Sequence, residues 1–125
     1  MQLVSEIVAY ASRTGTRRNL DALRARGWRL LVSATGAHRT EGFPYAIDNG
    51  AWTAFQKKQP FDSRAFIRVV VLLGALADWV ACPDIVAGGL QSLRLSMKWL
   101  PWVLQHTPRA LLPVQDGQIP SRKSA

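Results

Sequence analysis

The chain has 125 residues, 48% of them hydrophobic and 19% charged, so it is long enough for one packed domain and too apolar for a wholly disordered chain. Its 16 Lys and Arg against 8 Asp and Glu give a formal charge of +8, which favours an anionic partner, either nucleic acid or an anionic membrane surface. The single cysteine, Cys82, excludes an internal disulfide and a zinc cluster of several cysteines.

The sequence also lacks targeting signals and cofactor motifs. The N-terminus has neither the basic start nor the apolar core of a signal peptide. The longest apolar stretch, residues 65–77, contains Arg68 and is too short to cross a bilayer. There is no phosphate-binding loop, dinucleotide fingerprint or Cys/His cluster. We therefore expect a cytoplasmic protein with no membrane partner, no metal and no cofactor.

The first third of the chain predicts a strand, a helix and a second strand. Leu3–Ala11 mixes β-branched and small apolar residues, which is typical of a strand. Thr16 is placed to cap a helix over Arg17–Arg26, and Gly27 is placed to end it. The short apolar run Trp28–Ser33 then predicts the next strand.

The middle of the chain repeats this alternation. Pro44–Ile47 predicts a brief strand that ends at Asp48. A helix is expected from Asp62 to about Ala77, with Asp62 or Ser63 as its cap. Asp78–Cys82 predicts the following strand, which ends before Pro83 and Asp84.

The last third predicts one more helix and one more strand. Apolar side chains recur at helical spacing and form one face, namely Leu90, Leu93, Met97, Leu100 and Leu104. Pro101 lies inside this pattern and is expected to kink or shorten the helix. Arg109–Val114 predicts a strand, and residues 119–125 form an irregular basic tail. The alternation predicts an α/β domain over residues 1–118, with about four parallel strands and covering helices.

Three acidic motifs follow the predicted strands at near-equal intervals, and their carboxylates are Asp48, Asp84 and Asp116. In parallel α/β folds the carboxyl ends of the strands are the edge where ligand-binding groups converge. The motifs therefore predict a polar site on this edge of the sheet.

The first motif combines a carboxylate with small and aromatic neighbours. Asp48 is followed by Asn49 and Gly50, which permit close approach, and by Trp52, which is suited to stacking. This set is suited to the hydrogen-bond donors of a purine. Asn49 and Gly50 are equally typical of a tight turn.

The second and third motifs carry similar alternatives. Asp84 precedes Gly88 and Gly89, whose backbone N–H groups we expect to be open to a ligand at a helix start. Asp84 is also suited to be a helix cap or a loop anchor. The side chain of Gln115 has an acceptor and donors that match an amide or purine edge. The segment that ends at Gly117 is also consistent with an ordinary turn.

The remaining reactive and aromatic residues predict packing. Cys82 ends a buried strand and is expected to be a packed small side chain. Trp99 and Trp102 are expected to be packing or interface groups. His38 lies in a polar loop and His106 at a helix end, and neither is expected to be catalytic.

Together these motifs resemble the tRNA-guanine transglycosylase superfamily, and most closely the DpdA-like proteins of phages and bacteria, which insert 7-deazaguanine derivatives into DNA. The segments that carry the resemblance are Tyr10–Leu20, Phe43–Trp52, Ala77–Gly89 and Leu112–Gly117. The resemblance covers most of the chain. It implies a (β/α)₈ TIM barrel, of which this chain would be the N-terminal half, because a full barrel has about 250 residues.

The resemblance also implies roles for individual residues. Asp48 would be catalytic, holding the departing or incoming base and helping the exchange. Asp84, Gln115 and Gly117 would bind the deazaguanine base, together with Asn49 and Gly50 beside Asp48. In the family reaction a carboxylate attacks the anomeric carbon of the sugar, and the modified base resolves the covalent intermediate.

Two departures from the family pattern matter. The family's nucleophilic aspartate lies on a later strand than those of this chain, and nothing here could form the C-terminal zinc site of the tRNA enzymes. We therefore expect a truncated transglycosylase that is inactive by itself in base exchange.

The resemblance implies DNA as the partner in a bacterial or phage-infected cell, with tRNA as the alternative. Phosphate contacts are expected from Arg13, Arg17 and Arg18. Self-association or a second chain would complete the barrel, because half a barrel exposes two sheet edges. The alternative functions are a non-catalytic nucleic-acid-binding module and a degenerate, poorly folded remnant.

Overall fold

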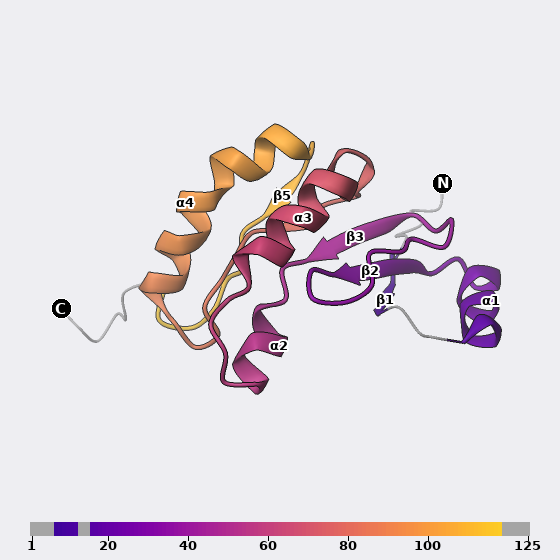
Figure 1. The fold of residues 1–125 in the computed structure, drawn as a ribbon, viewed down its shortest axis with the longest axis horizontal. Coiled ribbons are helices and arrows are strands. Elements are labelled where there is room, and N and C mark those ends of the chain that lie inside the picture. Colours follow the sequence, from indigo (N-terminus) through magenta and orange to yellow (C-terminus); the bar gives the residue numbers. More distant parts are fainter. Residues whose placement is uncertain (1–6, 13–15, 119–125) are drawn as a thin grey trace, which may run out of the picture.

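The computed structural model describes residues 7–12 and 16–118, and shows an α/β fold built on one sheet (Figure 1). The strands are β1 (Tyr10–Ser12), β2 (Arg29–Ser33), β3 (Tyr45–Asp48), β4 (Val80–Ala81) and β5 (Ala110–Leu111). The helices are α1 (Arg17–Ala25), α2 (Ala51–Gln56), α3 (Ser63–Leu73) and α4 (Leu90–His106), and a single 3₁₀ turn, η1 (Gly74–Leu76), follows α3.

The sheet is parallel throughout, and its strands follow one another in chain order, β1-β2-β3-β4-β5. Each strand therefore pairs with the one before it, and within the described residues the order never reverses. The register aligns Ser33 with Asp48 and Ala81 with Leu111. Because all strands run the same way, the loops that follow them open on one common edge of the sheet.

The predicted elements agree with this fold in kind, with three differences. The described sheet has the five strands that the individual segments predicted, one more than the overall expectation of about four. The first strand spans Tyr10–Ser12 rather than Leu3–Ala11, and residues 1–6 lie outside the described ranges, as does the predicted tail at 119–125. Helix α2 was not predicted, because its six residues are too few to show a helical period.

The helix starts that were predicted from capping residues are confirmed. The hydroxyl of Thr16 accepts a hydrogen bond from the backbone N–H of Asn19 at 3.4 Å, and the carboxylate of Asp62 accepts one from Ala65 N–H at 3.0 Å. Both bonds satisfy a backbone donor that the first helical turn leaves unpaired. Gly27 follows the end of α1 with φ of 72°, a conformation that glycine adopts without strain.

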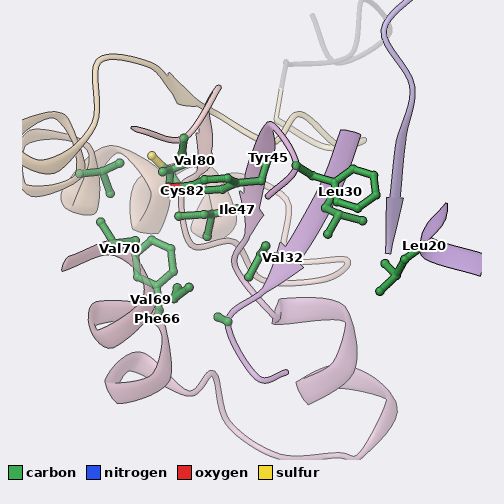
Figure 2. Close-up of a cluster of buried hydrophobic side chains, with 14 residues drawn as sticks. Leu20, Leu30, Val32, Tyr45, Ile47, Phe66, Val69, Val70, Val80 and Cys82 are labelled. Atoms are coloured by element: carbon green, nitrogen blue, oxygen red, sulfur yellow. The ribbon is translucent and has the colours of Figure 1, made fainter. Parts of the chain in front are cut away.

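The core lies between one face of the sheet and the helices (Figure 2). The sheet contributes Leu30 and Val32 from β2, Tyr45 and Ile47 from β3, and Val80 from β4. Helix α3 covers them with Phe66, Val69 and Val70. The ring of Phe66 lies 5.5 Å from that of Trp99, so α4 packs beside α3 over the same face. The prediction that Trp99 and Trp102 are packing groups is confirmed, because both contact this core.

The buried face of α4 differs from the apolar stripe in its sequence. Ser92, Ser96 and Val103 are fully buried, whereas Leu90, Met97 and Leu104 are about half exposed. The hydroxyls of the two serines bond to backbone groups of the β4–α4 loop, which makes their burial favourable. The helix also continues past Pro101 to His106, so of the kink or shortening that was expected at this proline, the shortening does not occur.

The opposite face of the sheet carries a different set of side chains. By register and alternation it holds Tyr10, Ser12, Arg29, Leu31, Ser33, Ala46 and Asp48. The helices that contribute to the core, α1, α3 and α4, pack on the Leu30 face instead. No helix within the described ranges is long and apolar enough to cross a membrane.

Candidate functional site

The carboxyl edge of the sheet brings together the predicted site residues of three loops. Asp48 ends β3, Asp84 lies in the loop after β4, and Gln115 lies in the loop after β5. Side-chain hydrogen bonds link the β3 loop to the β4 loop, and the β4 loop to the β5 loop. The edge is therefore a connected polar surface and not three independent turns.

Asn49 is the residue that joins the ends of β3 and β4. It is 4% exposed, and its amide Nδ2 donates to the carbonyl of Cys82 and to Oδ1 of Asp84, both at 2.7 Å. Its Oδ1 accepts a hydrogen bond from the backbone N–H of Ala51 at 2.8 Å, at the first residue of α2. One side chain thus fixes the start of α2, the end of β4 and the Asp84 carboxylate.

Gln115 makes the second connection, between the β4 and β5 loops. Its Oε1 accepts from the backbone N–H of Gly88 at 3.0 Å and of Gly89 at 3.4 Å. Its Nε2 donates to the carbonyl of Ile85 and to the hydroxyl of Ser92, both at 2.9 Å. All donors and acceptors of this amide are in use, so contact with a base requires these bonds to be exchanged.

These bonds overturn the expectation for the start of α4. The N–H groups of Gly88 and Gly89 were expected to be open to a ligand, but Gln115 occupies both. An N–H that already has an acceptor in the protein gains little from a second one. The anion-binding capacity of this helix start is therefore used inside the protein.

Glycines allow the loops to approach each other closely. Gly50 has φ of 82°, and a Cβ there would lie 3.1 Å from Cγ2 of Thr35. Gly117 has φ of 85°, and a Cβ there would lie 3.6 Å from Cα of Gly89. Both predicted site glycines thus have a conformational role in the edge, and their contact with a base stays a prediction.

Cavities of modest size open at this edge, and the two aspartates line different ones. Asp48 lines a cavity of about 170 Å³ with Ser12, Leu31, Ser33, Gly36 and Ala37. Asp84 lines a largely apolar cavity of about 190 Å³, beside Phe55 and Phe61, and a wider one of about 450 Å³ that also includes Gln115 and Asp116. Asp84 therefore lines two of these cavities, and Asp48 lines the third.

The electrostatics of the edge differ between the acids. Burial raises the pKa of Asp48, the Gly50 N–H that bonds its carboxylate at 3.2 Å opposes the rise, and the charge of Asp84 adds to it. A carboxyl group whose pKa is raised is suited to exchange a proton in a reaction. The Asp48 carboxylate is therefore the group of this edge best suited to proton transfer.

A pH-dependent effect of Asp48 on stability follows from the direction of this shift. Because the folded state raises its pKa, protonated Asp48 favours folding below the unfolded pKa of about 3.9, and this contribution is lost as the pH rises through the folded pKa. Asp48→Asn is therefore expected to raise Tm at pH 7 by roughly 2–4 °C, with the difference shrinking as the pH falls through the folded pKa and vanishing near pH 4. Thermal melts followed by circular dichroism measure the Tm difference at pH 7 and at acidic pH, with Asp116→Asn as the control. A lower Tm for Asp48→Asn at pH 7 would contradict the expectation.

The predicted nucleic-acid-binding arginines are described in part. Arg17 and Arg18 are exposed in the first turn of α1, and Arg13 lies outside the described residues. Ser12, the last residue of β1, lines the Asp48 cavity. Contact of these arginines with phosphate stays a prediction.

Three further features of the described residues are the Cys82 thiol, the side-chain types that bind metals, and Trp52. Cys82 is fully buried, as predicted, and burial raises the pKa of its thiol to about 11, so it is protonated at neutral pH. Within residues 7–12 and 16–118 no group of three or more His, Cys, Asp and Glu side chains is placed to hold a metal ion. Trp52 is 58% exposed on α2 and stacks on Phe55 at 5.6 Å.

Sequence reasoning missed the serines that support the edge. Ser92 Oγ accepts from the N–H of Ile85 at 2.9 Å, and Ser96 Oγ donates to the carbonyl of Pro83 at 2.7 Å. Their spacing of four residues was a signal for one helical face, but the leucine pattern hid it.

Searches against family models, curated proteins and solved structures found no match for this chain.

Proposed function

We propose that this protein is the base-recognition part of a guanine transglycosylase that exchanges guanine in DNA for a 7-deazaguanine base. The observation that carries the proposal is the Asn49 amide, which joins the ends of β3 and β4 and holds the Asp84 carboxylate. Such positioning by a buried side chain is what a recognition site requires. The motifs that resemble the transglycosylase superfamily supply the rest of the proposal.

The topology supports a partial (β/α)₈ barrel as the scaffold. Five parallel strands in chain order, with the core helices on one face, are the arrangement of consecutive βα units in a barrel. A doubly wound sheet would instead reverse its strand order. In the proposed barrel the Leu31 face would point inward, and the site edge would be the catalytic end.

The two aspartates would divide the work. Guanine and 7-deazaguanine present an N1–H and an amino group side by side, and an ionised carboxylate accepts hydrogen bonds from such donors. Asn49 occupies Oδ1 of Asp84, and Oδ2 has no protein partner within the described residues. Asp84 would therefore accept from the base, and Asp48, with its raised pKa, would hold the base and help the exchange.

The base-binding role of Asp84 has a direct test. Asp84→Asn preserves an acceptor for Asn49 but replaces the free carboxylate oxygen by an amide donor, which faces the donors of guanine. Binding of 7-deazaguanine, measured by isothermal titration calorimetry, is expected to weaken by about tenfold to a hundredfold. Asp116→Asn is the matched control, because it removes the same charge from an exposed acid on the same edge.

Asp84→Asn, compared with arginine variants of α1, also separates the two candidate functions. In a non-catalytic nucleic-acid-binding module the aspartates are structural, and the exposed Arg17 and Arg18 bind phosphate. Equal affinity of the wild type and Asp84→Asn for the base, with DNA binding that weakens in Arg17→Ala and Arg18→Ala, would favour that module. Loss of base binding in Asp84→Asn alone favours the transglycosylase.

A further inference from the structure

The outward faces of α3 and α4 carry large apolar side chains that nothing in the described structure covers. Their exposures range from 39% for Ile67 to 84% for Leu76. The set comprises Ile67, Val71, Leu72 and Leu76 from α3 and η1, and Leu90, Met97 and Leu104 from α4. Seven such residues on α3, η1 and α4 exceed the scattered exposure of a typical surface, and a patch of this kind marks an interaction site.

The two helices present these residues on the same side of the molecule. Phe66 of α3 contacts the rings of Trp99 and Trp102 of α4. Farther along, a Cβ at Gly74 would lie 2.8 Å from the carbonyl oxygen of His106, so the ends of α3 and α4 are also close. Figure 1 shows the helices side by side, and both bury their opposite faces against the sheet. The exposed residues therefore form one surface, here called the α3–α4 face.

Every charge on this face is positive. Arg64 and Arg68 alternate with Ile67 and Val71 on the outward side of α3, and Arg94 and Lys98 lie with Leu90 and Met97 on that of α4. Neither residues 63–77 nor residues 85–115 contain an Asp or a Glu. An apolar surface with cations alone requires a partner that is both apolar and anionic.

We propose that the α3–α4 face binds the surface of an anionic lipid bilayer. Its exposed apolar residues are aliphatic, whereas Trp99 and Trp102 turn toward the core. A bilayer surface accepts aliphatic side chains that enter the headgroup region, with Arg and Lys beside them on the lipid phosphates. The expectation of no membrane partner considered segments that cross a bilayer, and this contact needs none. The inference is independent of the base-exchange proposal.

Flotation with vesicles tests the proposal on the full chain. Binding is expected to vesicles of phosphatidylcholine with about one quarter phosphatidylglycerol, and not to phosphatidylcholine alone. Arg68→Gln with Lys98→Gln should weaken the partition coefficient by about tenfold or more. Val71→Ser with Met97→Ser leaves the charge unchanged and should weaken it by a similar factor, about tenfold, through lost apolar contact.

The matched control distinguishes this face from general attraction by a basic protein. Arg17→Gln with Arg18→Gln removes the same two charges from α1 and should change binding by less than about twofold. All altered side chains are exposed in the wild type, so the variants are expected to remain folded, which circular dichroism checks. Failure of the wild type to bind anionic vesicles overturns the proposal, and so does an equal loss in the α1 control. A wild type that forms dimers but does not bind vesicles would also overturn the proposal. If Val71→Ser with Met97→Ser disrupts those dimers, the α3–α4 face is a protein interface.

Discussion

Replacing Asn49 by alanine is expected to lower the free energy of unfolding by about 3 kcal/mol. The substitution removes all three hydrogen bonds of a side chain that is 4% exposed. It leaves the Cys82 carbonyl and the Ala51 N–H without their partners, and unpaired buried groups are the costly part of a lost hydrogen bond. Urea denaturation measures the change, with Asn19→Ala on the exposed surface of α1 as the control.

A second substitution at the same position separates hydrogen bonding from volume. Asn49→Asp retains the acceptor for Ala51 N–H but places a carboxylate against Oδ1 of Asp84, where the amide nitrogen lies at 2.7 Å. It is expected to destabilise the protein at neutral pH and to recover stability on acidification, as like charges are removed. A loss below about 1 kcal/mol for Asn49→Ala would show that Asn49 does not join the strand ends.

Replacing Phe66 by alanine is expected to cost about 4 kcal/mol of unfolding free energy. Phe66 is fully buried, and its ring contacts Phe61, Trp99 and Trp102 at centroid distances of 5.8, 5.5 and 6.1 Å. The residue is therefore shared by α3, α4 and the loop before α3, and its loss leaves a cavity where three elements meet. For a domain of this size the loss is a large fraction of the total stability.

The same substitution at an exposed phenylalanine provides the control. Phe55 is 52% exposed on α2, and Phe55→Ala should cost less than about 1 kcal/mol. Chemical denaturation of both variants measures the difference. Equal effects of the two substitutions would contradict the packing of α3 on α4 and would also remove the basis of the α3–α4 face.

The candidate site could be predicted only in outline from the sequence. Asp48, Asp84 and Gln115 were expected at strand ends, and the structure places them on one edge of the sheet. What Gln115 contacts was not predictable, since its partners in the β4–α4 loop lie more than 20 residues away in the chain. Asn49 was expected beside a base or in a turn, and its bonds to Cys82 and Asp84 appear only when β3 and β4 are paired.

The sequence by itself determined the features that depend on near neighbours. The caps at Thr16 and Asp62 and the βα alternation follow from hydrogen bonds and side-chain periods that span three or four residues, and these act whatever the rest of the chain does. Only the tertiary structure decided which face of α4 is buried. Leucines at helical spacing favoured one face, but Ser92 and Ser96 find backbone partners in the β4–α4 loop and are buried instead. These partners, Ile85 and Pro83, lie 7 and 13 residues before the serines. Their positions depend on how the β4–α4 loop folds back on the helix, which a pattern of three- and four-residue spacings does not contain.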